Sequence, residues 1–321
     1  RFEAELAGTI NDDQLEFDGW LAPASAFNRG GQLQYEVEAR SGRDSLQISG
    51  EFADLDTLSQ PNFQGHYYGP DIGMVLARLG LPPFADGAFD VRATLDSSEK
   101  MVNIDIDADV GTLDVKSQGE LDKLLQPSKG HFNTQASGPD LQALGDALGI
   151  EGLVHGVFDW SGDFEVENDI IFIKNARLAT EMDEVRLSGA VSTREGMPDS
   201  SLTLNFHSDE FSRWGLLIGK TWEEQGAIEL AGQVSTDAGG ILSIDATVEH
   251  EASKLHASGD IGPLSGPYDP DLNFEFQSRD MPRLAELMGL DGFPGGQFDM
   301  KGHIRKTGQE ILVDNVETTL E

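Results

Sequence analysis

The segment Val102-Asn103-Ile104-Asp105-Ile106-Asp107-Ala108-Asp109-Val110 alternates apolar and polar residues over its whole length. Successive side chains of a β-strand point to opposite faces, so this segment predicts a strand with one apolar face and one acidic face. The same alternation with a period of two recurs at 113–115, 202–206, 242–248 and 272–276. We therefore expect a mainly β protein built from half-buried antiparallel strands.

On both sides of this strand, glycines recur along the chain at a fixed period. Successive members of each column are 69, 70 and 70 residues apart, which indicates a structural repeat of about 70 residues. The three columns are Gly50, Gly119, Gly189 and Gly259; Gly80, Gly149, Gly219 and Gly289; and Gly87, Gly156, Gly226 and Gly296.

A short helix is predicted in each repeat, starting near Asp71, Asp140, Glu210 and Asp280. Aspartate can accept hydrogen bonds from the free amides of the first turn, and the glycine that follows each helix can adopt the left-handed cap conformation. Apolar residues at i, i+3 and i+7 give each helix one buried stripe. The stripes are Ile72, Val75 and Leu79; Leu141, Leu144 and Leu148; Phe211, Trp214 and Ile218; and Met281, Leu284 and Met288.

Each repeat is expected to hold about four strands and one short helix. In the first complete repeat the strands are predicted at 88–95, 101–110, 112–121 and 131–136. Both ends of the chain fall inside strand-like runs, which predicts one continuous elongated domain cut from a longer protein. Its parts are 1–68 (a partial repeat with an irregular loop at 20–31), 69–137, 138–207, 208–277 and 278–321 (a truncated repeat).

The apolar face of such a sheet is larger than the helices can cover. A ten-residue helix shades about a third of the roughly 475 Å² that four strands of seven or eight residues present. A twisted sheet that curls into an open groove would accommodate the remainder. The residues predicted to line it are Val102, Ile104, Ile106, Ala108, Val115, Phe132, Leu202, Leu204, Phe206, Leu242, Ile244, Val248, Leu272, Phe274 and Phe276.

Composition excludes several classes of function. The formal net charge of -35 disfavours nucleic acid and anionic membrane surfaces as partners. The chain contains no cysteine, which rules out disulfides and thiolate metal sites. No run approaches the roughly 18 apolar residues of a membrane-spanning helix.

Motifs that would carry enzymatic or metal chemistry fail on spacing. Gly215–Thr221 resembles a phosphate-binding loop but has three residues between its glycines where four are needed. Asp105, Asp107 and Asp109 begin like a calcium loop, yet Val110 replaces its glycine and Lys116 its glutamate. His250 and His256 with the neighbouring Glu249 and Glu251 would lie across a hairpin. Trp214 and Trp222 fit a helix packed on the sheet better than a sugar site. We expect no enzyme, no cofactor and no metal.

Several motifs resemble the repeated C-terminal region of AsmA-like proteins, over roughly residues 69–321. They are Gly138-Pro139-Asp140-Leu141, Leu148-Gly149, Gly156-Val157-Phe158 and Leu187-Ser188-Gly189. Gly69-Pro70-Asp71 keeps the opening triplet, whereas Ser208-Asp209-Glu210 and Ser278-Arg279-Asp280 depart from it. AsmA-like proteins are related to TamB-like and bridge-like lipid-transfer proteins, whose repeating β-groove is thought to carry phospholipid.

The resemblance implies a periplasmic segment of a Gram-negative envelope protein, anchored in the inner membrane through a part outside this chain. It implies phospholipid acyl chains as ligands, transport toward the outer membrane in support of outer-membrane assembly, and contacts with outer-membrane or envelope proteins. The alternative is a structural or adhesive rod whose apolar faces close on one another. An enzymatic role has no supporting feature in the sequence.

Overall fold

The computed structural model describes residues 1–10, 13–22, 31–54, 60–79, 87–98, 100–124, 127–218, 226–264, 268–280, 296–307 and 310–320. The chain forms two compact units, Arg1–Asn168 and Asp169–Glu321. The division falls inside the predicted repeat 138–207. Both units are mainly antiparallel β, as predicted.

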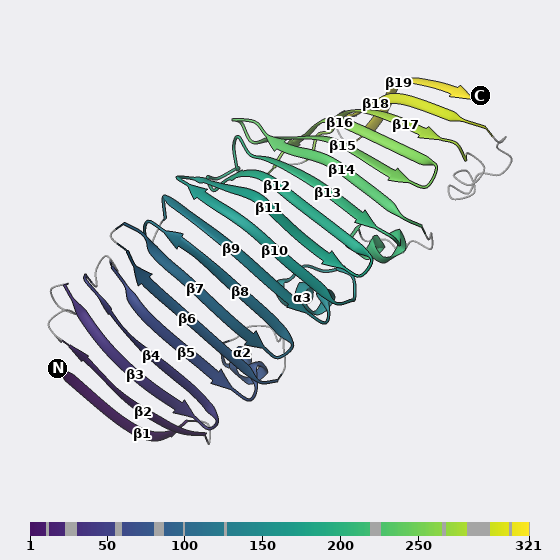
Figure 1. Cartoon of the computed structure of the whole chain (residues 1–321). Helices are drawn as coiled ribbons and strands as arrows, with labels where there is room; N and C mark the ends of the chain where they lie inside the picture. Colours follow the sequence, from purple (N-terminus) through teal and green to yellow (C-terminus); the bar gives the residue numbers. More distant parts are fainter. Residues whose placement is uncertain are drawn as a thin grey trace. The chain divides into compact units, whose positions relative to one another are not determined.

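Unit 1 is an open, curved sheet in which each strand from β1 to β9 pairs antiparallel with the next strand along the chain (Figure 1). Ten strands at a spacing of about 4.8 Å give a sheet roughly 45 Å across. The strands are β1 (Phe2–Ile10), β2 (Asp13–Ala22), β3 (Leu33–Ser41), β4 (Asp44–Phe52), β5 (Asn62–Gly69), β6 (Phe89–Ser97), β7 (Val102–Val110), β8 (Leu113–Leu121), β9 (Lys129–Gly138) and β10 (Phe158–Glu167).

Unit 2 repeats this antiparallel, chain-order pairing from β11 to β19. Irregularities in register occur in three of these pairs, β11 with β12, β15 with β16, and β18 with β19. The strands are β11 (Ile170–Thr180), β12 (Asp183–Ser192), β13 (Ser201–Ser208), β14 (Ile228–Thr236), β15 (Ile241–His250), β16 (Ser253–Pro263), β17 (Asp271–Ser278), β18 (Phe298–Thr307) and β19 (Glu310–Leu320).

The four strands predicted for the first complete repeat are confirmed as β6 to β9. The alternating segment Val102–Val110 is β7, and a two-residue turn joins it to β8. Gly111 takes a positive φ of 65° in that turn, which glycine tolerates without a steric penalty. One boundary was wrong, because Trp20–Ala22 finish β2 and do not belong to the loop expected at 20–31. Residues 23–30 lie outside the described part of the chain.

Three of the four predicted helices lie in described residues: α2 (Ile72–Leu79), α3 (Leu141–Leu148) and η1 (Phe211–Ile218). The third is a 3-10 helix. The predicted caps are confirmed for α3, where Asp140 accepts from the amide of Gln142 at 3.1 Å and Gly149 has φ 74°. The fourth predicted helix falls at 281–289, outside the described residues.

The glycine column that precedes each repeat's first strand has a common backbone conformation. Its φ angles are 100° at Gly87, 141° at Gly156, 126° at Gly226 and 148° at Gly296, a range that residues with a Cβ rarely adopt. In three repeats its carbonyl accepts the first amide of the helix. The donors are Ile72 to Gly87 at 2.9 Å, Leu141 to Gly156 at 2.9 Å, and Phe211 to Gly226 at 3.0 Å. This column therefore joins the start of each helix to the strand that follows it.

The other described glycine column lies where two strands approach closely. A Cβ at each position would be 2.1 to 2.2 Å from a carbonyl oxygen of the next strand, closer than atoms can pack. The pairs are Gly50 with Asn62, Gly119 with His131, Gly189 with Ser201, and Gly259 with Asp271.

Serine replaces the opening glycine in the two repeats that depart from the Gly-Pro-Asp triplet. The hydroxyl of Ser208 accepts from the amide of Glu210 at 3.2 Å, and that of Ser278 accepts from Asp280 at 3.2 Å. Such turns satisfy a free amide at the start of a helical segment. In these two repeats a serine hydroxyl, which glycine lacks, therefore binds the amide two residues further on.

Candidate functional site

Strand register brings the predicted lining residues of unit 1 to one face. Ile104 pairs with Leu95 and Gly119, Ala108 pairs with Val91 and Val115, and Gly119 pairs with Phe132. Because side chains alternate along each strand, residues paired in this way share a face. We call it the apolar face of unit 1, and its predicted members are Val102, Ile104, Ile106, Ala108, Val115 and Phe132.

Unit 2 has a corresponding face. Leu204 pairs with Gly232, which pairs with Ala246, and the row continues to Ala257 and Phe274. All nine predicted lining residues of this unit lie on what we call the apolar face of unit 2. They are Leu202, Leu204, Phe206, Leu242, Ile244, Val248, Leu272, Phe274 and Phe276.

These faces remain partly accessible. Thirteen of the fifteen predicted lining residues are half-buried, and only Val102 and Ala108 are buried, with 6% and 8% exposed. A closed β-sandwich core would bury most of them. In the part of the chain that the structure describes, the apolar faces are therefore covered incompletely.

The helices cover one end of the strands. In unit 1, Ile72, Val75 and Leu76 of α2 pack in one core cluster with Phe89 and Val110. In unit 2 the ring of Trp214 on η1 meets Phe206 edge-on, with centroids 5.0 Å apart. The middle rows of each face lie beyond these contacts.

A column of small residues crosses the middle rows and was missed in the sequence. Ala93, Gly162, Gly232 and Gly302 are again 69, 70 and 70 residues apart, and all lie on the apolar faces. Aromatic rings lie beside two of these glycines. A Cβ at Gly162 would meet the ring of Phe164 at 2.4 Å, and one at Gly302 would meet Phe274 at 2.8 Å.

Trp160 and Phe164 belong to the same face, as pairing with Ala136 and Phe132 shows. Their rings are stacked with centroids 6.4 Å apart, and the Trp160 indole donates to the hydroxyl of Thr134 at 3.1 Å. Neither residue was predicted from the sequence to line the groove. The alternation beginning at Phe158 was the signal that could have identified them.

Few acidic or basic side chains interrupt these faces. Among the described side chains on them, Asp44, Asp183 and His250 lie at the end of the strands next to the helices, and Lys306 lies at the opposite end. On the other side of β7, Asn103, Asp105, Asp107 and Asp109 form part of a polar face. Each sheet thus has one apolar and one strongly acidic side.

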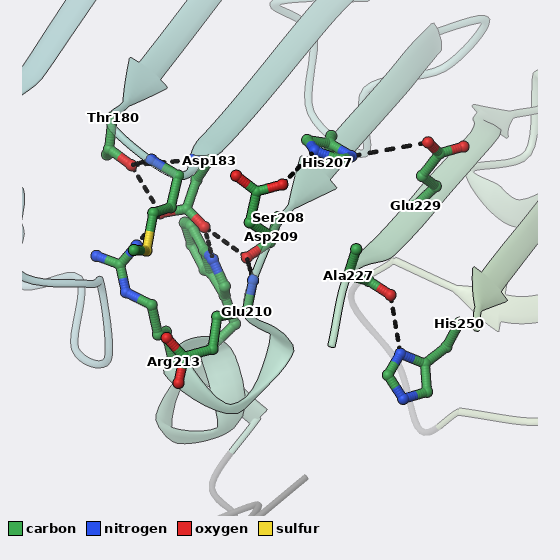
Figure 2. Close-up of polar contacts among 12 residues, drawn as sticks. Thr180, Asp183, His207, Ser208, Asp209, Glu210, Arg213, Ala227, Glu229 and His250 are labelled. Atoms are coloured by element: carbon green, nitrogen blue, oxygen red, sulfur yellow. Dashed lines mark hydrogen bonds and ion pairs between the residues drawn. The ribbon is translucent and has the colours of Figure 1, made fainter. Parts of the chain in front are cut away.

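The buried carboxylate of Asp183 anchors η1 to the sheet (Figure 2). One oxygen accepts from Ser208 Oγ at 2.6 Å and Trp214 Nε1 at 2.8 Å, while the other accepts from Thr180 Oγ1 at 2.7 Å and Arg213 Nη1 at 2.8 Å. Four donors, one of them cationic, compensate the cost of burying this charge. The cluster holds a helix in place and was not foreseen from the sequence.

The two histidines considered as metal ligands lie on opposite faces. His250 pairs with Ile228 on the apolar face, and its Nδ1 meets the carbonyl of Ala227 at 2.9 Å (Figure 2). His256 pairs with Thr247 on the polar face. Glu249 binds Lys254 at 2.7 Å. These side chains do not converge, and the described residues contain no group of three ligands placed to hold a metal ion.

The other two motifs are also placed within regular elements. Asp105, Asp107 and Asp109 lie on β7, where Asp105 accepts from Gln118 at 3.0 Å, so they do not form a loop around an ion. Gly215–Ile218, the start of the run resembling a phosphate loop, belongs to η1. The rest of that run lies outside the described residues.

His303 joins three strands on the polar face of unit 2. Its ring nitrogens meet Asp271 on β17 at 2.7 Å and Asp314 on β19 at 3.1 Å. The hydrogen bond with Asp271, followed by that with Asp314, raises the pKa of the imidazole above its ordinary value. The bond with His303 in turn lowers the pKa of Asp314.

Comparison of the chain with models of known protein families, with curated proteins and with solved structures finds no match. Among the described helices, none has the length and apolar character needed to span a bilayer.

Proposed function

We propose that the apolar faces bind phospholipid acyl chains and that the chain is a segment of an AsmA-like periplasmic protein. In this proposal the faces form a repeating β-groove that conducts phospholipid between the inner and outer membranes and supports outer-membrane assembly. The parent protein is anchored in the inner membrane and contacts outer-membrane or envelope proteins. The observation that carries the proposal is the half-exposure of thirteen of the fifteen lining residues.

The energetics favour such a ligand. Exposing an acyl chain of 16 carbons to water costs about 12 kcal/mol, at about 0.8 kcal/mol for each methylene group. A strip of apolar side chains offsets that cost without specific polar contacts. The residues of the apolar faces supply aliphatic and aromatic groups and few charges, as this chemistry requires.

The acidic opposite face supports the same proposal. A large exposed apolar surface ordinarily causes association between copies of a protein. The formal charge of -35 produces repulsion between copies, which would keep a protein with accessible apolar faces soluble while lipid enters them.

Native mass spectrometry of protein purified without detergent tests the proposal. We expect phospholipid to remain bound, and a chain that carries none would contradict lipid binding. Ile104→Asp places a charge on the apolar face, whereas Asn103→Asp places the same charge one residue away on the polar face. We expect only Ile104→Asp to carry less bound lipid, because it disrupts the apolar face of unit 1.

The same pair of variants distinguishes the rod with closed cores. Ile104 would be fully enclosed in such a rod, and burying an unpaired carboxylate would cost several kcal/mol and abolish folding. On an open face the Ile104→Asp chain folds, because water solvates the carboxylate. A folded Ile104→Asp chain with less bound lipid, beside a folded Asn103→Asp chain that keeps its full load, would support the groove.

A further inference from the structure

We propose that the apolar face of unit 2 selects phospholipids with zwitterionic headgroups over those with net negative headgroups. This inference rests on the proposed lipid binding and names the class of lipid. It follows from the charges at the edge of that face, where a headgroup must lie once its acyl chains occupy the middle rows.

The middle rows offer a headgroup no charged partner. Among the described residues there are Leu204, Gly232, Ala246, Ala257 and Phe274, none of which is ionisable. At the helix end, Asp183 and Arg213 are already paired with each other at 2.8 Å. A headgroup over this face is therefore expected at the opposite end, beside the turns that we call the far rim.

The far rim of unit 2 consists of the described residues 193–200, 237–240, 264 and 268–270, together with Asp169, which directly precedes β11. Residues 265–267 lie outside the described part. Acidic side chains predominate among the described rim residues, and Arg194 is the cation in the turns themselves. The carboxylates belong to Asp169, Glu195, Asp199, Asp237 and Asp269.

Three cations lie in or near this rim, and each has a partner in the chain. Arg305, which pairs with Asp271 at the start of β17, donates through Nε to Asp314 at 2.8 Å. Arg194 Nε donates to the hydroxyl of Ser192 at 3.4 Å, and Lys306 Nζ donates to the carbonyl of Tyr268 at 2.7 Å. Asp237 is held by the amides of Gly239 and Ile241 at 2.8 and 2.9 Å, which fixes its carboxylate in the turn. The rim therefore presents more negative than positive charge to an arriving headgroup.

Screening makes this local charge decisive. The Debye length is about 8 Å at physiological ionic strength, so rim carboxylates act on a headgroup beside them while most of the polar face is screened. A phosphatidylglycerol headgroup would be repelled. A zwitterionic headgroup carries an ammonium that the carboxylates attract, and its net charge is zero.

Lipid uptake from mixed vesicles tests this inference with the full chain. Vesicles contain equal amounts of dioleoyl phosphatidylcholine and dioleoyl phosphatidylglycerol, so that repulsion from the vesicle surface affects both lipids equally. Bound lipids are extracted and quantified by mass spectrometry. We expect a roughly fivefold excess of phosphatidylcholine at about 0.1 M salt and a ratio approaching one at about 1 M.

Two variants of equal net charge locate the effect. The rim variant neutralises three rim carboxylates, which changes the net charge from -35 to -32. Its substitutions are Glu195→Gln, Asp199→Asn and Asp269→Asn. The polar-face variant makes the same change in net charge on the polar face. Its substitutions are Glu229→Gln, Asp245→Asn and Glu275→Gln. We expect the excess of phosphatidylcholine to fall at least twofold in the rim variant and to persist in the polar-face variant.

The outcomes separate the two proposals. Equal uptake of both lipids at low salt would overturn the headgroup preference. An equal response of the two variants would overturn its origin at the far rim. Either result would leave lipid binding intact. Absence of both lipids from the protein would instead contradict the proposed function itself.

Discussion

The indole of Trp214 on η1 donates to the buried carboxylate of Asp183 on β12 at 2.8 Å, across 31 residues of sequence. The side chain of Asp183 is 2% exposed, so each donor around it replaces water that the charge has lost. This contact explains how a helix of eight residues, too short to be stable alone, is held against the sheet.

Trp214→Phe should lower the free energy of unfolding by about 1–3 kcal/mol, because it removes one hydrogen bond to a buried charge. Urea denaturation followed by circular dichroism measures the change. Trp20→Phe is the matched control, since the Trp20 indole donates to Glu36 at the exposed surface and its loss should cost less than about 0.5 kcal/mol. Equal effects of the two variants would show that Asp183 does not depend on the indole.

Gly119→Ala should destabilise unit 1 by about 1–3 kcal/mol, since the added methyl would lie 2.2 Å from the carbonyl oxygen of His131. Gly8→Ala is the control, because nothing lies within 4 Å of a Cβ there. We expect the control to be neutral or slightly stabilising through the entropy of the unfolded chain. Thermal melts of both variants compare them directly. A Gly119→Ala chain as stable as the wild type would disprove the close approach of β8 and β9.

The stability of unit 2 should depend on the protonation of His303. Its folded pKa is raised above the unfolded value of about 6.5, so its contribution is fully present below that pH. The contribution is lost as pH rises through the folded pKa. His303→Gln should remove this part of the decline in the urea midpoint as the pH rises above about 6.5, the unfolded value. An unchanged decline in the variant would contradict the prediction.

Trp160 should report lipid on the apolar face of unit 1. Its ring lies on that face beside Gly162, whereas Trp20 donates to Glu36 on the polar face. Phospholipids with brominated chains should quench part of the intrinsic fluorescence. We expect Trp160→Phe to lose most of that quenching and Trp20→Phe to retain it. Quenching that persists fully without Trp160 would place the chains elsewhere.

The amino-acid sequence by itself determined the strand pattern and the repeat. The alternation of Val102–Val110 selects a strand because only a period of two separates its aspartates from its aliphatic residues. The glycine columns were visible at their fixed period, and the structure adds their causes, a positive φ at Gly156 and close strand approach at Gly119. The helices at 72–79 and 141–148 followed from local spacing and capping, which act within a few residues.

Only the tertiary structure decided which distant side chains meet. Asp183, Ser208 and Trp214 come together because β12 pairs with β13 and η1 folds back over both, and no local pattern encodes that return. The alternation of apolar and polar residues also did not determine how accessible Ile104 and Leu204 are. A strand in a closed sandwich has the same periodicity as one on an open face. Exposure depends on what packs against the face, which is a property of the whole unit.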